Sequence, residues 1–369
     1  MKKTILAASL LISSLAFSQT TPDDRTKVIN HLQAIDTSKL FSPEAQAKYN
    51  EGVAAYEANK TEEAIAKFTE AITMEPKFVK AYNNRANIYF SIKKYDEAIA
   101  DFTQITVITD TLPHTFFMLG QVKDAKGDVQ GAIEEYSKEI AKKPKAETYY
   151  NRGVDYFQVA EYEKAIADFD KAIGMKNDYA YAYNDRGSAK KMNNDLSGAV
   201  KDYERAILIN PKLTFAYNNL GSIFRVQKKY QEAIAEYNNA IRLKPDYYIA
   251  INNKGMAEFE AVRYEDAVKT FTQCIAINKD YAFAYNNRAA AYLKLQKFKE
   301  AIADADKAIT INPEYGGAYL NRGIAREMLR DLEGACADWL QGATYGIESS
   351  ESYYNSNVCE EVQKYKEQK

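Results

Sequence analysis

The fold of this chain is decided by a stretch that recurs along it, and residues 146–177 show it most fully: AETYYNRGVDYFQVAEYEKAIADFDKAIGMKN. Frames of this kind begin at residues 45, 79, 113, 146, 180, 214, 248, 282 and 316, a period of 34 with one residue missing from the third frame. Frame position 20 is alanine in every copy, and position 24 is a large aromatic in eight of nine. A length of 369 residues alone suggests two or three globular domains, but a period of this kind indicates an array of small repeated units instead.

Each frame is predicted to hold two helices. Five frames carry proline at position 32, where it closes the unit because proline cannot continue a helix; these are Pro76, Pro144, Pro211, Pro245 and Pro313. Positions 4, 8 and 11 share one helical face, which carries Tyr149, Gly153 and Tyr156 in the quoted frame. The alanine at position 20 and the small residue at position 8 predict a close approach of the two helices, with aromatics beside them. One frame cannot bury this face alone, so neighbouring frames must stack.

This pattern of aromatic, small residue, alanine and proline resembles the tetratricopeptide repeat family. The resemblance implies an all-α fold, an α-solenoid of about nine helix-turn-helix repeats forming a right-handed superhelix whose first helices line a concave groove. Members of the family usually bind peptides or assemble complexes, and the fold itself carries no catalysis. The third frame, with Phe116, Gly120 and Lys123, fits the pattern least well.

The remaining segments suit the ends of such an array. The expected organisation is a signal peptide (1–18), an N-terminal lead with a short helix around residues 28–35 (19–44), nine repeats (45–78, 79–112, 113–145, 146–179, 180–213, 214–247, 248–281, 282–315, 316–349) and a C-terminal capping helix and tail (350–369). Ser42 and Pro43 give an N-cap signal for the first repeat helix. The capping helix is expected from Tyr353 to Tyr365. A solenoid end needs a cover of this kind.

The N-terminus indicates export. Lys2 and Lys3 precede an apolar run from Ile5 to Phe17, and the small residues Ala16 and Ser18 are spaced as a cleavage site after Ser18. The run is too short to span a bilayer well, although an uncleaved membrane anchor is the alternative. We therefore expect a periplasmic, secreted or cell-surface protein without an integral membrane span.

Composition and motifs argue against nucleic acid and catalysis. With 49 basic and 51 acidic residues the formal charge is −2, so no basic surplus exists to neutralise phosphates. The two histidines, His31 and His114, have no partner at metal-binding spacing, and no glycine-rich phosphate loop is present. We expect no enzyme activity, no metal site and no cofactor.

The three cysteines can form disulfides if the chain is exported. Cys336 and Cys359 are 23 residues apart, which allows either a disulfide between antiparallel helices or two buried thiols. Cys274 stands where sister repeats carry alanine, so a small core residue is expected there.

Arginine and aspartate vary together among the frames. The five frames with arginine at position 7 are the five with aspartate at position 23, giving Arg85 with Asp101, Arg152 with Asp168, Arg186 with Asp202, Arg288 with Asp304, and Arg322 with Asp338. Position 7 lies on the packing face, where an unpaired charge is costly. We predict bidentate bridges within one repeat or to the next. A row of arginines for an acidic ligand is the functional alternative.

Asparagine dominates position 6, opposite the packing face. Solvated helix faces prefer better helix formers, and an amide can pair with both the N–H and the C=O of an extended peptide. The row resembles the asparagine ladder in the repeat region of O-GlcNAc transferase, and by that resemblance Asn219, Asn253, Asn287 and Asn321 would clamp a peptide backbone. Asp185 and Met118 would interrupt it.

Neighbouring positions extend this groove hypothesis. Position 5 adds Asn184, Asn218, Asn252 and Asn286, and position 2 adds the apolar groups Tyr181, Phe215 and Phe283. Apolar pockets beside amides that read a backbone would make a peptide groove. The alternative is that the amides bond to neighbouring repeats and the aromatics pack against them.

These patterns favour a non-catalytic scaffold that binds a protein or an extended peptide. A structural or self-assembling envelope protein without a peptide ligand is the second hypothesis, and the oligomeric state is left open with a monomer favoured. Sugar binding by the 29 tyrosines is a third, weaker one, because most tyrosines recur at packing positions.

Overall fold

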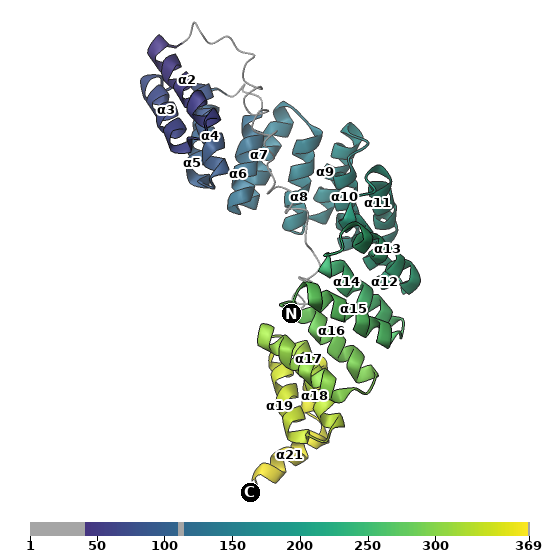
Figure 1. Ribbon diagram of the computed structural model, residues 1–369. Helices are drawn as coiled ribbons and strands as arrows, with labels where there is room; N and C mark the ends of the chain where they lie inside the picture. Colours follow the sequence, from purple (N-terminus) through teal and green to yellow (C-terminus); the bar gives the residue numbers. More distant parts are fainter. Residues whose placement is uncertain (1–40, 110–113, 368–369) are drawn as a thin grey trace. The chain divides into compact units, whose positions relative to one another are not determined.

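The computed structural model describes residues 41–109 and 114–367, with side chains as far as residue 364. The expected signal peptide and the helix around residues 28–35 lie outside the described residues. The described part contains twenty helices, α2 to α21, and no strand (Figure 1). The prediction of an all-α solenoid of helix-turn-helix repeats is confirmed.

Eighteen of the helices alternate along the chain as the first and second helices of nine repeats. The first helices of the repeats are α2 (Pro43–Glu57), α4 (Val79–Ser91), α6 (Thr115–Lys126), α8 (Ala146–Gln158), α10 (Ala180–Met192), α12 (Thr214–Val226), α14 (Tyr248–Glu260), α16 (Ala282–Lys294) and α18 (Gly316–Met328). The second helices are α3 (Thr61–Met74), α5 (Tyr95–Ile108), α7 (Val129–Lys142), α9 (Tyr162–Met175), α11 (Leu196–Ile209), α13 (Tyr230–Leu243), α15 (Tyr264–Ile277), α17 (Phe298–Ile311) and α19 (Leu332–Thr344). The atypical third frame forms its pair as the others do.

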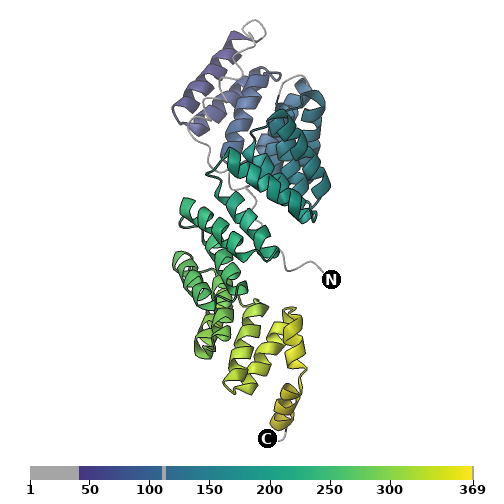
Figure 2. The same ribbon diagram turned by 90° about the vertical axis from the view of Figure 1, so that its right-hand side faces the viewer.

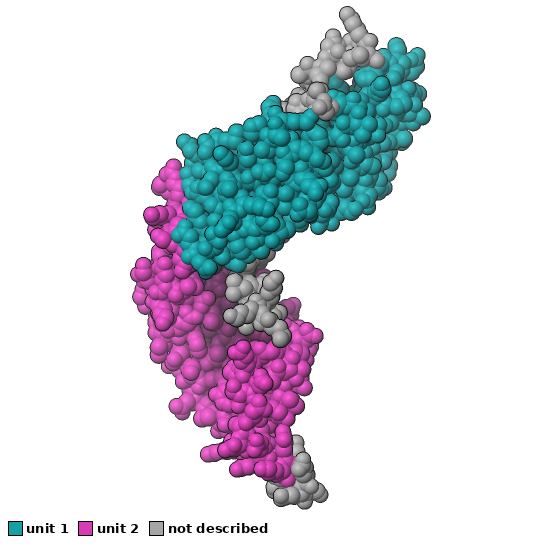
Figure 3. Space-filling view, turned by 180° about the vertical axis from the view of Figure 1, so that it is seen from behind, with its two compact units in different colours: residues 1–195 teal, residues 196–369 magenta. Residues whose placement is uncertain are grey.

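The chain divides into two compact units, residues 1–195 and 196–369, and the boundary falls between α10 and α11 (Figure 3). Inside each unit, a first helix packs on its second helix, and that helix packs on the first helix of the next repeat (Figures 1 and 2). First helices of consecutive repeats also touch, as α16 touches α18. In the second unit, α12, α14, α16 and α18 therefore form one continuous layer, on which the candidate site lies.

The core follows from three frame positions. The nine alanines at position 20 are fully buried, and the aromatics at position 24 are at most 2% exposed. Position 8 is glycine in most frames because the aromatic ring at position 24 lies on it. A Cβ added to Gly255 would come within 2.5 Å of Phe271. Small residues at positions 8 and 20 thus let the two helices enclose one large ring.

The turn inside each helix pair has a fixed geometry. Position 15 has a positive φ in every repeat, at Asn59, Lys93, Gly127, Ala160, Asn194, Lys228, Val262, Gln296 and Arg330. A left-handed residue ends a helix sharply, and glycine or asparagine adopts it at least cost. Val262 has a φ of 62°, and this backbone conformation is strained because the side chain is β-branched. The side chain is 68% exposed, so its burial does little to offset the strain.

The C-terminal end differs from the expectation of a single capping helix. The structure has two helices, α20 (Glu348–Tyr354) and α21 (Asn357–Glu367), with Asn355 and Ser356 between them. Asparagine and serine compete for backbone hydrogen bonds and so favour helix ends over helix interiors. Both helices pack on α19.

The two cysteines near this end are bonded to each other. A disulfide joins Cys336 of α19 to Cys359 of α21, with 5.6 Å between their Cα atoms. Cys274 is a buried thiol that hydrogen-bonds the backbone oxygen of Tyr248 at 3.2 Å. It occupies the core, where the sequence places it.

Candidate functional site

At five places along the chain, a side-chain hydrogen bond joins a first helix to the first helix of the next repeat. The partners are always 35 residues apart, from position 5 of one repeat to position 6 of the next. The bonded atoms are Asn84 Nδ2 with Tyr49 Oη (3.1 Å), Tyr150 Oη with Asp185 Oδ2 (2.7 Å), Asn253 Nδ2 with Asn218 Oδ1 (3.0 Å), Asn287 Nδ2 with Asn252 Oδ1 (3.0 Å) and Asn321 Nδ2 with Asn286 Oδ1 (2.8 Å). We call these bonds the inter-repeat ladder.

The ladder corrects the prediction for position 5. Asn184, Asn218 and Asn252 are 3%, 6% and 6% exposed, so they do not line a groove. Asn286 is less buried, but it donates to Tyr315 Oη at 3.1 Å and accepts from Asn321. Position 5 faces the adjacent repeat, and its amides serve contacts between repeats.

Position 6 is partly exposed in three consecutive repeats of the second unit. In all three the side-chain Nδ2 donates a hydrogen bond to the preceding repeat; the residues are Asn253, Asn287 and Asn321. Their Oδ1 atoms have no hydrogen-bond partner among the residues that the structure describes, and none of them is shut off from solvent. An amide fixed through its nitrogen has its oxygen fixed as well. The result is a row of oriented acceptors, one in each repeat.

The row differs in α8 and α10 of the first unit, where position 6 is buried. Asp185, expected to interrupt it, is 8% exposed and accepts from Tyr150 and from Asn184 Nδ2 at 2.9 Å. Asn151 is 9% exposed. A carboxylate whose two oxygens are both used inside the protein offers little to a ligand. The candidate site therefore lies on α14, α16 and α18 of the second unit.

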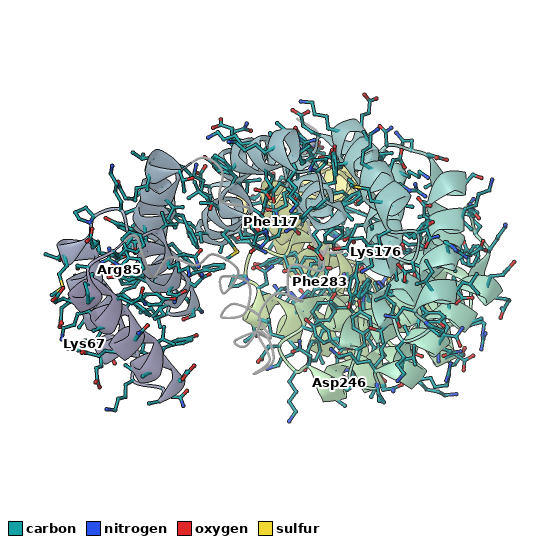
Figure 4. The ribbon with its side chains drawn as sticks, turned by 90° about the horizontal axis from the view of Figure 1, so that it is seen from above. Lys67, Arg85, Phe117, Lys176, Asp246 and Phe283 are labelled. Carbon is teal, nitrogen blue, oxygen red and sulfur yellow. A yellow bond between two sulfur atoms is a disulfide. The ribbon has the colours of Figure 1, made fainter. Side chains whose placement is uncertain are left out.

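Of the apolar groups at position 2, Phe283 lies on the same helix as one member of this row. Phe283 of α16 is partly buried, with ring centroids 5.4 Å from Tyr281 and 5.1 Å from Tyr315 (Figure 4). Phe215 is likewise partly buried, whereas Tyr181, in the first unit, is 37% exposed. The aromatics therefore pack partly between repeats, as the alternative interpretation held, and they keep part of their surface exposed.

The arginines are engaged in bridges inside their own repeats. Nε and Nη2 of each arginine donate to the two carboxylate oxygens of the aspartate sixteen residues on, at 2.6–2.9 Å, in Arg85–Asp101, Arg152–Asp168, Arg288–Asp304 and Arg322–Asp338. These arginine side chains are 15–17% exposed and the aspartates 3–9%. Arg186 and Asp202 belong to different units, so their pairing stays a prediction.

The third nitrogen of each arginine reaches the preceding repeat, which the sequence interpretation missed. Nη1 donates to position 25 of that repeat: Arg85 to Thr69 (2.8 Å), Arg152 to Ser137 (2.9 Å), Arg186 to Asp170 (2.5 Å), Arg288 to Thr272 (2.8 Å) and Arg322 to Asp306 (2.5 Å). Tyrosines at positions 4 and 11 flank the guanidiniums of Arg85, Arg152 and Arg288. The four bridged arginines each join three helices and are not a row for an acidic ligand.

Two carboxyl groups that the sequence interpretation did not single out meet in the first unit. Asp155 of α8 is 2% exposed and hydrogen-bonds Asp124 of α6. Burial and the facing carboxyl of Asp124 raise the pKa of Asp155 to about 9. The side chain is therefore a neutral acid at pH 7, held between two repeats.

Within residues 41–109 and 114–367, no three histidine, cysteine or acidic side chains are grouped so that they could hold a metal ion. In the same ranges, no helix combines the length and the apolar character needed to cross a bilayer.

Comparisons with known proteins identify the repeat. Models described as tetratricopeptide repeats match residues 49–112, 146–179, 180–213, 214–247 and 282–315, together more than half of the chain. A similar curated protein is the Hsp70-Hsp90 organizing protein of Triticum aestivum, 32% identical over 107 residues that make up 29% of this chain and 18% of the relative. Another is the small glutamine-rich tetratricopeptide repeat-containing protein 2 of Saccharomyces cerevisiae, 39% identical over 82 residues, 22% of this chain and 24% of the relative. The matches thus span less than a quarter of either relative.

A solved structure agrees with this fold. A tetratricopeptide repeat protein from Parabacteroides merdae superposes with a TM-score of 0.54 at 18% identity, covering 65% of this chain and 96% of that one. At such low identity the likeness shows the fold alone. Repeat models that match more than half of the sequence, on residues that the structure folds into stacked helix pairs, establish that this chain belongs to the tetratricopeptide repeat family.

Proposed function

We propose that this chain is a non-catalytic scaffold of the cell envelope that holds an extended segment of a partner protein along α14, α16 and α18. The observation that carries the proposal is the row of oriented Oδ1 acceptors on Asn253, Asn287 and Asn321. Acceptors repeated once per repeat suit the N–H groups of an extended backbone, which every sequence supplies. The relatives support a role in protein assembly, since one is named an organizing protein for two chaperones.

Apolar side chains beside the row supply the second half of such a site. Met256 of α14 and Phe283 of α16 are partly exposed on the first helices. Binding grooves combine mostly apolar walls with a few fixed polar groups, which is the arrangement present here. Side chains of the bound segment would contact these residues while its backbone contacts the amides.

The experiment compares the wild type and three variants of the full chain in capture of partners from the envelope fraction of the source cells. The variant Asn253→Ala/Asn287→Ala/Asn321→Ala should lose at least about tenfold in partner affinity, because three backbone contacts disappear. Asn84→Ala breaks a ladder bond in the first unit and leaves the three outward amides and their acceptors in place, so it controls for lost stability. Asn238→Ala, at an exposed position on the second helix α13, is the surface control. Equal capture by the triple variant and the wild type would refute the groove.

Export is tested separately. Expression with the full N-terminus in a bacterial host should yield a mature chain that begins at Gln19, as read by mass spectrometry of the purified protein. The disulfide between Cys336 and Cys359 supports an oxidising location. An uncleaved chain retained in the cytoplasm would contradict the envelope role while leaving the groove experiment unaffected.

A further inference from the structure

The last repeat ends in a surface unlike that of its sister repeats. At position 5, where the ladder uses asparagine, it has Leu320; at position 21, where the other repeats have isoleucine or valine, it has Cys336. Position 24 is Trp339, the single tryptophan of the chain. These residues form one apolar cluster with Ala335 and with Cys359, Tyr354 and Val362 of the terminal helices. The cluster takes the place of a tenth repeat.

Helix α20 is secured without help from the disulfide. It follows α19 through a short turn at Gly346, its buried Ser350 lies against Gly342, and the ring of Tyr353 stacks on Trp339 with centroids 4.8 Å apart. Continuous chain and ring stacking hold it next to α19.

Helix α21 has few contacts of its own. It is 11 residues long, and an isolated helix shorter than about 12 residues is marginal in water. Its contacts with the cluster come from Cys359 and Val362, while Glu360, Glu361, Gln363 and Lys364 are exposed. A hydrogen bond from Gln363 Nε2 to Tyr354 Oη (2.8 Å) ties it to α20. The covalent link to Cys336 is therefore the main restraint on its position.

We propose that the Cys336–Cys359 disulfide is a redox latch that keeps α21 docked over the end of the last repeat. A dithiol reductant breaks the S–S bond: each sulfur takes up one electron and one proton, and the reductant is oxidised to its own disulfide. With the bond gone, α21 leaves α19, and the surface around Leu320 and Cys336 becomes accessible to solvent. The oxidised chain has a covered end and the reduced chain an open one.

The test uses the full chain in three forms: wild type with and without dithiothreitol under native conditions, Cys336→Ser/Cys359→Ser, and Cys274→Ala as a matched control. Cys274 is the remaining cysteine of the same unit and lies at a position where sister repeats carry alanine. Hydrogen exchange of backbone amides in residues 357–364 should become at least about tenfold faster in the reduced protein and in the double variant. The emission of Trp339, which Tyr353 of α20 covers, should stay unchanged in both, and Cys274→Ala should match the oxidised wild type in exchange rate.

Three results would overturn the proposal. One is unchanged exchange in residues 357–364 in the double variant. Another is a bond that dithiothreitol fails to reduce in the folded protein, because such a bond is a permanent cross-link. The last is faster exchange that extends over α12 to α18, since the disulfide would then stabilise the whole unit.

Discussion

Asn287 donates its side-chain amide to the side-chain oxygen of Asn252, 3.0 Å away in the preceding repeat. Asn252 is 6% exposed, whereas Asn287 is partly exposed with its own oxygen unbonded in the described structure. One asparagine therefore serves as an internal support, and its neighbour, held by that support, faces solvent. The same division recurs in Asn218 with Asn253.

This pair should show measurable coupling. Asn287→Ala leaves the buried oxygen of Asn252 without a donor and should cost about 1–3 kcal/mol of unfolding free energy. Asn252→Ala removes the acceptor, and the double variant should lose less than the sum of the single variants. Urea denaturation supplies the three values. The pair Asn252 and Asn321, which share no hydrogen bond, is the control and should be additive.

Breaking one bridge between arginine and aspartate should lower the free energy of unfolding by more than breaking one ladder bond. In Arg152→Ala the carboxylate of Asp168, 7% exposed, loses both of its donors, and we expect a loss of about 3–5 kcal/mol. The first repeat has the reversed arrangement, Glu51 with Lys67 at 3.1 Å. Arg152→Glu/Asp168→Lys should therefore recover part of the loss, as thermal denaturation can measure. A double variant no more stable than the worse single one would contradict a pairwise bridge.

Replacing Val262 should stabilise the protein. Glycine adopts a left-handed backbone without the steric penalty of a branched side chain, so Val262→Gly should gain about 1 kcal/mol. Because Val262 is 68% exposed, little packing is lost with it. The reciprocal change Gly127→Val, at the equivalent turn with φ 92°, should lower Tm. A lower Tm for Val262→Gly would show that this side chain makes a contact worth more than the strain.

Asp155 should make stability depend on pH in an unusual direction. Its pKa is raised to about 9 in the folded chain from the ordinary 3.8 of an aspartate, so between these values the folded state holds a proton that the unfolded state has lost. Stability from this group is therefore complete below about pH 4 and falls as pH rises toward 9. Asp155→Asn, which cannot ionise, should exceed the wild type in Tm increasingly from pH 5 to pH 9.

The control for this series is Asp178→Asn, a change at an exposed turn residue of the same unit. Its Tm difference from the wild type should stay nearly constant across the same pH range. A constant difference for Asp155→Asn as well would mean that Asp155 is ionised in the folded protein.

Much of the fold and part of the site could be predicted from the sequence. The period and its prolines predicted the helix pairs, and the joint variation of Arg152 and Asp168 with their counterparts predicted a bridge, because opposite charges on packing faces must meet. The prediction that the asparagines at position 5 line the groove was wrong. On one helix, positions 5 and 6 are only 100° apart, and the neighbour decides which of them is covered.

A signal for the ladder was nonetheless present. Where position 6 is an acceptor, Asp185, position 5 of the preceding repeat is the hydroxyl donor Tyr150. Where both positions are asparagine, the sequence does not show which residue donates and which accepts, because an amide can do either. The meeting of Asp124 with Asp155 could not be read from the sequence either, because like charges do not suggest a contact.

The 35-residue step of the ladder has a consequence for how such a chain can change length. Excising residues 248–281, one whole period, would bring Asn218 opposite Asn287, and the same kind of amide bond would form again. The arginine contact would survive too, because Arg288 would meet Asn238 where it now meets Thr272. Gain or loss of a complete unit therefore preserves the ladder bond and the arginine contact, whereas gain or loss of a fraction of one does not.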